Sequence, residues 1–457
     1  MGFLAIAIIG LTIILIVRQY QTQAVLFLSG FSLLLLAYGH HLLSGEPVPG
    51  LAEAGTGWFG FDLFQIVQES FSTRAAGIGM IIMAAGGFAR YMSSIQASTA
   101  LVKLAVRPLS CIRNPYILLS LSYLVGQILN IFVPSAAGLA MLLLVAMYPT
   151  LVRLGLRPAA VAAVIGTTAC LDLGPASGAS NLAAEVSGLE PIVYFVRHQL
   201  PVALFVMPVV AALHFFWQRR CDAMDGEAAG SVADELVVGA QDDTPAPALY
   251  ALLPILPLAL LLVFSPLVVH QVRLDVVTAM LISLFVGIAC EIIRLRSLKL
   301  ALAGIVHFFK GMGDIFAKVV TLIVAAETFA TGVKATGLIG DLLGLVESGG
   351  HGGLVMMIAL VLLVGCIALL TGSGNAALFS FAGIIPAAAT PMGLSAVALM
   401  LPSQLAAGLF RSMSPVAGVI IAVSSAANVS PFRIVRRTAV PMLGGVVVMV
   451  LVSAWLG

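Results

Sequence analysis

Two short polar stretches, 171–181 and 411–418, interrupt long apolar runs of this sequence and carry side chains suited to binding. These side chains are Asp172, Ser177, Ser180, Asn181, Arg411 and Ser414. A guanidinium inside an apolar run is costly to keep there, and its planar fork binds a carboxylate through two hydrogen bonds. A neighbouring aspartate can neutralise it, accept a proton or bind sodium. Arg411 and Asp172 therefore indicate either a site for a small anion with a coupling cation, or a structural ion pair.

Two further polar clusters lie at turns inside other apolar runs, at 133–138 ("VPSAAG") and 370–376 ("LTGSGNA"). They offer hydrogen-bonding groups for the same anion from Ser135, Thr371, Ser373 and Asn375. Small hydroxyl residues also let membrane helices pack closely, so each serine can equally be structural. Glu327, within the run 313–334, is a weaker candidate for carrying a proton.

The composition is that of an integral membrane protein. Of 457 residues, 61% are hydrophobic and 9% are charged, and the mean hydropathy is +1.12. The runs are long enough for transmembrane helices, which need about 20 apolar residues each. A net charge of +2 gives no reason to expect a nucleic-acid partner. The expected partners are a small anionic substrate and the lipid bilayer.

The sequence contains no recognisable catalytic motif, neither H-E-x-x-H nor G-x-S-x-G, and its five cysteines are scattered without metal-binding spacing. We therefore expect no enzyme activity, no cofactor and no firm metal site. The exception is a coupling ion, Na⁺ or H⁺, with Asp172 as the place for sodium.

The two halves of the chain repeat each other. Three prolines recur at a constant offset of 240 residues: Pro175, Pro191 and Pro201 match Pro415, Pro431 and Pro441. The segment 84–89 matches 325–330 at an offset of 241, and 133–140 matches 370–377 at about 237. The acidic, Gly- and Ala-rich segment 218–248 separates the halves and has the composition of a flexible linker.

The distribution of Lys and Arg predicts the orientation, because cytoplasmic loops carry more of them. It puts the linker in the cytoplasm and both termini on the periplasmic side. The run 116–153 then begins and ends on the cytoplasmic side, whereas the run 353–390 begins and ends on the other side. The two equivalent segments are therefore expected to be hairpins that enter the membrane from opposite faces.

These features predict an all-α polytopic membrane protein with about ten full crossings. An inverted repeat with two opposed re-entrant hairpins and two interrupted helices is the architecture of secondary transporters, with a scaffold and a transport domain. The expected divisions are N-terminal scaffold helices (1–60), a first inverted repeat (61–217), a cytoplasmic linker (218–248), further scaffold helices (249–300) and a second inverted repeat (301–457). Two short amphipathic stretches, 62–70 and 303–311, are expected to lie along the membrane surface as connecting arms.

The helix breaks have a physical reason. Backbone groups in hydrocarbon must be paired, so irregular chain survives there only against protein or a water-filled cavity. Each break is followed by the N-terminus of a half-helix, whose free N–H groups and positive dipole end favour an anion. We therefore expect the two breaks and the two hairpin tips to form one substrate site.

Several stretches resemble the DcuC family of anaerobic four-carbon dicarboxylate carriers, within the ion transporter superfamily. They are "AAGIGMIIMAAGGFA" (75–89), "FFWQRR" (215–220), "TGSGNA" (371–376), "GLFRSMSPVAGVIIAV" (408–423) and "SPFRIVRRTAVP" (430–441). The resemblance implies exchange or export of succinate, fumarate or malate across a bacterial inner membrane, by a homodimer whose transport domain moves like an elevator. It also implies binding at the hairpin tips by Ser135, Ser373 and Asn375, and at the breaks by Ser177, Arg411 and Ser414.

Two other functions stay open. A carrier for another carboxylate or for an amino acid would use the same architecture. An ion channel would need a continuous pore, which interrupted helices alone do not exclude.

Overall fold

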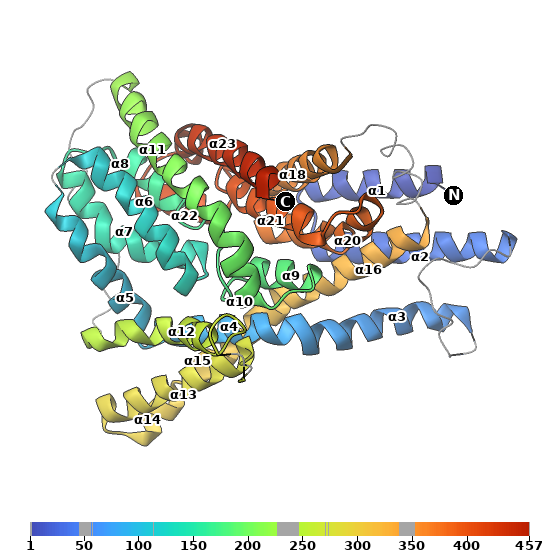
Figure 1. The fold of residues 1–457 in the computed structure, drawn as a ribbon, viewed down its shortest axis with the longest axis horizontal. Helices are drawn as coiled ribbons and strands as arrows, with labels where there is room; N and C mark the ends of the chain where they lie inside the picture. The colour runs from blue at the N-terminus through green and yellow to red at the C-terminus, as the bar shows by residue number, and fades with distance from the viewer. Residues whose placement is uncertain are drawn as a thin grey trace.

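The computed structural model describes residues 2–44, 56, 58–112, 114–225, 246–269, 271–272, 274–337 and 352–456, and their regular structure is entirely helical. Within this described part, nine helices are long and apolar enough to cross a membrane, or ten if one bent pair counts as a crossing. The all-α polytopic fold expected from the sequence is thus confirmed (Figure 1).

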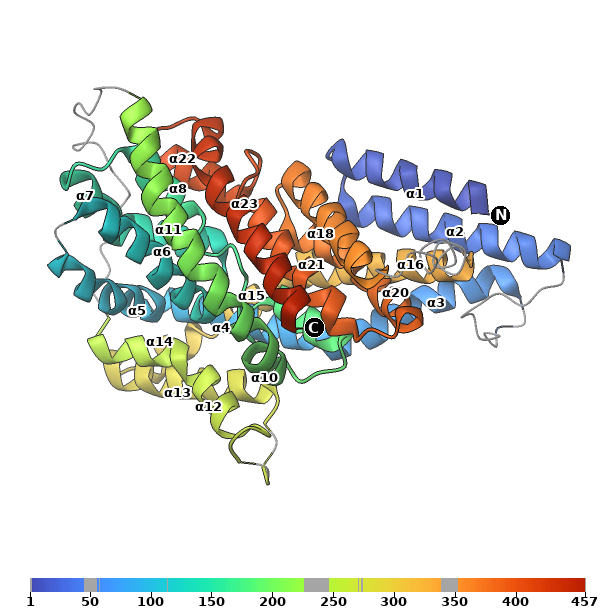
Figure 2. The same ribbon diagram turned by 45° about the horizontal axis from the view of Figure 1, so that its top comes forward.

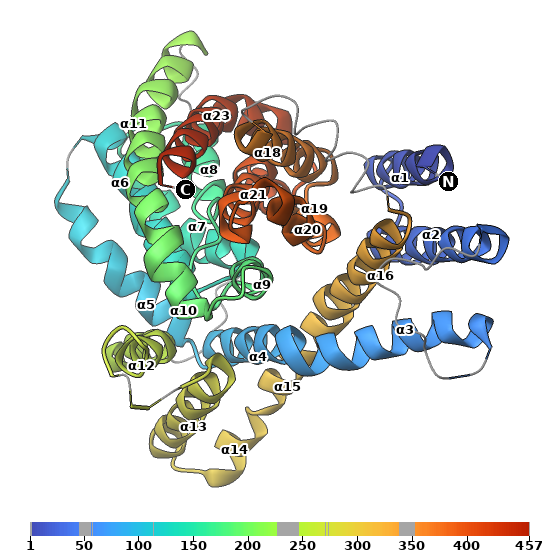
Figure 3. The same ribbon diagram turned by 45° about the vertical axis from the view of Figure 1, so that its right-hand side comes forward.

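The helices form two groups, which Figure 3 shows side by side. We call the first group the hairpin body. Its helices are α6 Pro115–Phe132, α7 Ala136–Arg153, α8 Pro158–Gly166, α9 Gly178–Val186, α10 Pro191–Tyr194, α11 Leu200–Met224, α18 Gly352–Thr371, α19 Gly374–Ala382, α20 Ile385–Ala389, α21 Ala396–Arg411, α22 Gly418–Ala426 and α23 Pro431–Leu456. Within it, α11 packs along α23 and α18 along α21, and Figure 2 shows the first of these pairs.

We call the second group the frame. Its helices are α2 Thr22–Ser44, α3 Phe59–Arg74, α4 Met80–Ser94, α12 Leu256–Val263, α13 Val276–Leu295, α14 Leu298–Ala303, α15 Val306–Ile315 and α16 Thr321–Ala335. Within the frame, α2 packs along α16, and α4 packs against both α15 and α13. Helix α1 (Gly2–Val17) contacts α2 and α18, and α5 (Ala97–Val106) packs on the short helix Ala248–Ile255 that leads into α12.

Each hairpin turns at a serine that begins the returning helix. The first hairpin is α6 and α7, and the second is α18 followed by α19 and α20. Ser135 caps α7 by accepting a hydrogen bond from the Gly138 N–H at 3.2 Å, and Ser373 caps α19 in the same way from the Ala376 N–H at 3.2 Å. A side-chain cap satisfies one of the N–H groups that a helix leaves unpaired at its start. The tips that the sequence predicted are therefore two equivalent helix starts.

Each interrupted helix has an irregular segment between two helical halves. In the first half of the chain, α8 and α9 are separated by residues 167–177, and in the second half α21 and α22 are separated by 412–417. Asp172 and Gly174 have φ values of +47° and +89°, the left-handed region that ends a helix, and Pro175 follows without an N–H to donate.

The repeat seen in the sequence recurs in the helix boundaries. Helices α9 and α22 begin and end 240 residues apart. Directly after them, Gly188 and Asn428, also 240 residues apart, adopt the left-handed conformation with φ of +68° and +50°. Two π-helical turns, Ala75–Gly79 and Phe316–Val320, are 241 residues apart and contact each other through Gly79 and Val320. The two halves are therefore built alike.

The stretch 62–70 lies within α3, and the stretch 303–311 runs from the end of α14 into α15. That they lie along the membrane surface stays a prediction. Helix α3 runs through its π turn into α4 as a single run, Gly60–Ser94, and α14 to α16 form the run Leu298–Ala335. Gly77 in the first π turn has φ of −82° and ψ of −110°, outside the helical region, so α3 and α4 meet at a kink. The frame also takes helices from both predicted repeats. The predicted linker starts too early: its first seven residues, 218–224, belong to the end of α11, and its residues 226–245 lie outside the described part.

Candidate functional site

A cavity of about 550 Å³ lies between the hairpin body and the frame. The hairpin body lines it with Ser135 and Gly138 at the first hairpin tip, Asn375 at the second tip, and Gly178 at the first break. The frame lines it with residues of α4 and α15. Of the four elements expected to form one site, the cavity brings together both hairpin tips and one break.

Three helices present their N-termini to this cavity: α7, α9 and α19. Their N-cap residues are Ser135, Ser177 and Ser373. Each serine hydroxyl accepts one hydrogen bond from a backbone N–H of its own first turn, at 3.2 to 3.4 Å. The other N–H groups of each first turn have no partner within the helix, and the positive ends of three helix dipoles meet here. This arrangement favours a bound anion.

Glycines bring the hairpins and breaks into backbone contact. A Cβ atom added at Gly408 of α21 would lie 2.3 Å from the carbonyl oxygen of Cys170 in the first break. A Cβ added at Gly372 of the second tip would lie 2.7 Å from the Ala417 nitrogen in the second break, and φ at Gly372 is +72°. Both distances are far below van der Waals contact, so these positions require glycine.

Arg411 connects the two breaks rather than facing the cavity. Its Nη2 donates to the Ala169 carbonyl at 2.6 Å, and its Nη1 lies 3.3 Å from Oδ2 of Asp172. The two side chains are 13% and 9% exposed, and neither residue lines the cavity. The structure thus places Arg411 in the ion pair that the sequence left open as its structural alternative.

Two buried glutamines that were not predicted as site residues complete this connection. Gln404 of α21 donates to the carbonyl oxygens of Leu171 and Asp172 at 3.1 and 3.3 Å, and accepts from Gln199 at 2.8 Å. Gln199 in turn accepts from the Gly174 N–H and from the Ser180 hydroxyl, both at 3.1 Å. Their burial inside strongly apolar runs was the available signal, because a buried amide needs partners.

Three other predicted site residues hold the local backbone. Asn181 donates to the carbonyls of Pro175 and Ser177, each at 2.8 Å, which fixes the first break. Thr371 donates to the Ile367 carbonyl at 2.7 Å. Ser414 is fully buried, and its hydroxyl accepts from the Val416 N–H at 3.4 Å. Ser180, Asn181, Thr371 and Ser414 do not line the cavity.

Glu327 lies away from Asp172 and takes part in a different ion cluster. Its carboxylate is 3.1 Å from Nη2 of Arg74 on α3, while Nη1 of the same arginine is 2.5 Å from Glu185 on α9. One guanidinium therefore neutralises two carboxylates, one from the frame and one from the hairpin body. The cluster joins the two groups of helices by an ion pair.

Among the described residues, no group of three or more His, Cys, Asp or Glu side chains is arranged to hold a metal ion. A sodium ion at Asp172 would have to compete with Arg411 for the same carboxylate. Arg411 could leave Asp172 only if another anion took the place of the carboxylate, because a buried guanidinium without a partner is strongly destabilising.

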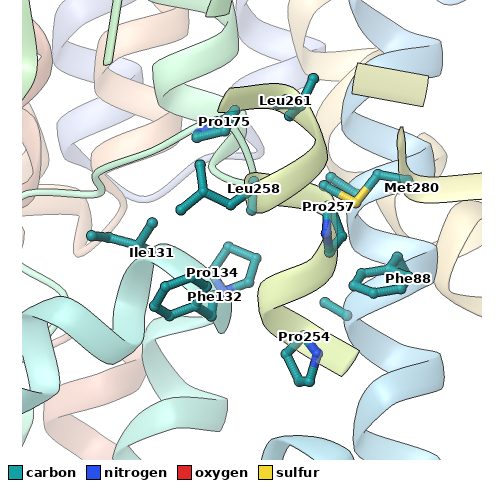
Figure 4. Close-up of a pocket in the computed structure, with 13 residues that line it drawn as sticks. Phe88, Ile131, Phe132, Pro134, Pro175, Pro254, Pro257, Leu258, Leu261 and Met280 are labelled. Atoms are coloured by element: carbon teal, nitrogen blue, oxygen red, sulfur yellow. The ribbon is translucent and has the colours of Figure 1, made fainter. Parts of the chain in front are cut away.

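An apolar joint holds the first hairpin tip and the first break against the frame (Figure 4). Pro134 and Pro175 of the hairpin body face Pro254, Pro257 and other apolar side chains of the frame and the short helix before α12. Proline has no N–H, so this joint rests on van der Waals contact rather than on hydrogen bonds.

The model of the C4-dicarboxylate anaerobic carrier family, DcuC, matches residues 2–455 of this chain. The chain belongs to the DcuC family. It is a transporter and not an enzyme. The anaerobic C4-dicarboxylate transporter DcuC of Escherichia coli K12 is 34% identical to it over 438 residues, which cover 96% of this chain and 93% of that protein. A Vibrio cholerae relative is 37% identical over 438 residues, covering 95% of this chain and 93% of its own.

Two solved transporters share the fold of this DcuC-family chain. The YdaH transporter of Alcanivorax borkumensis, described as having an unusual topology, superimposes with a TM-score of 0.65 at 17% identity, over 95% of this chain and 98% of its own. MtrF of Neisseria gonorrhoeae, from a class of antimetabolite efflux pumps, superimposes with a TM-score of 0.62 at 15% identity, over 96% of each chain. At these identities the likeness concerns the fold alone.

Proposed function

We propose that this protein is a secondary transporter for C4-dicarboxylates such as succinate, fumarate or malate, and that the 550 Å³ cavity receives the substrate. The observation that carries the proposal is the meeting of three helix N-termini at one cavity between the hairpin tips. They offer N–H groups and positive dipole ends to a carboxylate. Family membership supports the dicarboxylate class.

The hairpin body is the transport domain in this proposal, and it moves against the frame as in an elevator. Two observations support this. The joint in Figure 4 is apolar and can shift without breaking hydrogen bonds. The two hairpins also differ in their contact with the frame. The second hairpin touches it, because α19 contacts α16 and Gly383 packs against Ala330. In the first hairpin, the cavity separates α7 from α4. Transport by alternating access requires that repeated elements adopt two such positions.

Coupling to H⁺ or Na⁺, or exchange of one dicarboxylate for another, is part of the same proposal. So are a homodimer in the bacterial inner membrane, a cytoplasmic linker and periplasmic termini. The excess of Lys and Arg near the helix ends on the predicted cytoplasmic side supports this orientation. Labelling of cysteines placed at positions 230 and 270 with an impermeant reagent in intact cells tests it. Labelling of position 230 from outside the cell would show that the orientation is the reverse of the proposed one.

An amino-acid carrier is the second candidate, and one observation favours it. The cavity is lined by Asp314 as well as by Arg90, and these two side chains form an ion pair. A zwitterionic substrate could pair with both charges, whereas a dicarboxylate could pair only with the arginine.

Counterflow in proteoliposomes tests the proposed function. Proteoliposomes are loaded in parallel with unlabelled succinate, fumarate, butyrate or an amino acid, and uptake of the same compound in labelled form is followed. We expect saturable counterflow of the two dicarboxylates and none of butyrate. Flux that fails to saturate and shows no counterflow would identify a channel, and counterflow of amino acids alone would identify the second candidate.

A further inference from the structure

The charged residues that line the cavity are Arg90 and Asp314. Arg90 lies near the end of α4, and its Nη1 is paired with Oδ2 of Asp314 on α15. Their side chains are 43% and 55% exposed, so both remain accessible from the cavity. The other polar groups on this wall are hydroxyls, those of Ser93, Ser98 and Thr99. The wall that faces the hairpin tips is therefore polar and carries a cation with one anionic partner.

The pair is not needed to hold α4 and α15 together. Glycines already bring these helices into backbone contact, since a Cβ added at Gly87 would lie 2.8 Å from the Phe308 carbonyl oxygen, and one added at Gly311 would lie 2.8 Å from Cα of Gly87. Ion pairs as exposed as this one contribute little to stability, because solvent screens the attraction. A structural role therefore does not account for a charged pair on the wall of a cavity in a membrane protein.

A dicarboxylate carries two negative ends joined by an apolar middle. The three helix N-termini can receive one carboxylate, and the second needs a separate cation. Arg411 does not line the cavity, because it is bound to Asp172 and the Ala169 carbonyl. We infer that Arg90 binds the second carboxylate of the substrate, and that Asp314 holds the arginine side chain until the substrate replaces it. This inference rests on the proposed function and assigns the choice of dicarboxylates over monocarboxylates to Arg90.

The roles of the two partners differ, which makes the inference testable. If Arg90 binds substrate and Asp314 competes with it, Arg90→Gln weakens succinate binding while Asp314→Asn leaves it unchanged or tightens it. A structural pair would give the same effect for both changes. Arg90→Lys keeps the charge without the planar fork, so its affinity should lie between those of the wild type and Arg90→Gln.

The measurement is the Kd of purified protein for succinate and for butyrate, by calorimetry, with thermal unfolding as a check on folding. The matched control is Arg436→Gln, because Arg436 is about as exposed and is paired with Asp225, which two other arginines also contact. We expect Arg90→Gln to raise the Kd for succinate about tenfold or more, the loss of one charge-assisted contact. The control should change it less than about twofold.

Equal effects of Arg90→Gln and Arg436→Gln on succinate binding would overturn the inference while leaving the proposed function intact. So would parallel losses in Arg90→Gln and Asp314→Asn. If the wild type binds no dicarboxylate but binds an amino acid, both the proposed function and this inference fail. In that case Asp314→Asn should weaken binding as strongly as Arg90→Gln.

Discussion

Arg411 and Asp172 neutralise each other between the two breaks, where their side chains are 13% and 9% exposed. A buried charge is tolerated in such a place only while its partner remains. The Ala169 carbonyl takes a second hydrogen bond from Arg411, so the arginine also satisfies backbone that the first break leaves without a helical partner. Its position therefore favours a role in holding the two interrupted helices together.

We expect Arg411→Ala to leave Asp172 buried without a partner and to lower the free energy of unfolding by about 3–5 kcal/mol. Asp172→Ala should have a comparable effect, because the guanidinium is then unpaired. The double variant should regain most of the loss, since neither charge remains. Thermal unfolding in detergent and succinate binding measure the two consequences. A double variant that is stable but no longer binds succinate would show that Arg411 is the main contact with the anion, as the sequence first suggested.

Among the elements, α11 and α23 are joined at one end by a cluster of charges around Asp225. Arg437 donates to its carboxylate at 2.7 Å, and Arg436 is bound to the other oxygen. Burial alone would raise the pKa of Asp225, but the hydrogen bonds from Arg436 and Arg437 outweigh it and hold this pKa well below its usual range. A carboxylate with a depressed pKa in the folded state stabilises the fold above its unfolded pKa of about 3.9, and that stability is lost as the pH falls further.

We therefore expect the wild-type protein to lose thermal stability more steeply than Asp225→Asn between about pH 5 and pH 3, because only the wild type has this carboxylate to protonate. At pH 7 the variant should be the less stable of the two. The control is Glu69→Gln, whose carboxylate accepts from the neutral amide of Gln65. Parallel pH profiles for the wild type and Asp225→Asn would mean that this cluster does not hold the helix ends.

A second ion cluster, Glu185 with Arg74 and Glu327, connects an interrupted helix to the frame. Glu185→Gln removes the contact from the hairpin body but leaves Arg74 paired with Glu327. We expect this variant to unfold within about 1 kcal/mol of the wild type. It should nevertheless change the position of the hairpin body, seen as reduced labelling of a cysteine placed at Leu142 in the cavity wall. Glu69→Gln, on the same helix as Arg74, is the control, and equal labelling in both variants would contradict the prediction.

The elements that the sequence predicted well are those that depend on local chemistry. Prolines and glycines marked both breaks, and the offset of 240 residues located their equivalents. The π turns were not predictable, because neither contains a proline to mark it, although Gly77 in the first has a non-helical conformation with φ of −82° and ψ of −110°. Side-chain partners were least predictable: Arg90 and Asp314 are 224 residues apart, and only the close packing of α4 on α15 brings them together. Tertiary packing also decides that Ser135 and Asn375 line the cavity and that Arg411 does not.

At the scale of the whole molecule, the two halves have one architecture but two positions relative to the frame. The hairpin serines, Ser135 and Ser373, are equivalent, so residues seven positions after them are equivalent too: Leu142 and Ser380. Leu142 lines the cavity and is partly exposed, whereas Ser380 is 1% exposed. A carrier that works by alternating access must exchange these two environments when its substrate site opens to the other side of the membrane.

Single cysteines at 142 and 380, in a protein whose five native cysteines are replaced by serine, make this exchange measurable. Without substrate, we expect an impermeant thiol reagent to label Leu142→Cys rapidly from the predicted cytoplasmic face, from which the first hairpin enters, and to leave Ser380→Cys protected. A succinate gradient that favours the opposite state should slow the first reaction and expose Ser380→Cys to the other face, because the repeats then trade positions. The labelling rates are measured in right-side-out and in inside-out vesicles, so that the reagent reaches each face of the membrane separately. If Ser380→Cys stays protected under every gradient while transport continues, the second hairpin never leaves α16, and the hairpin body does not move as a unit.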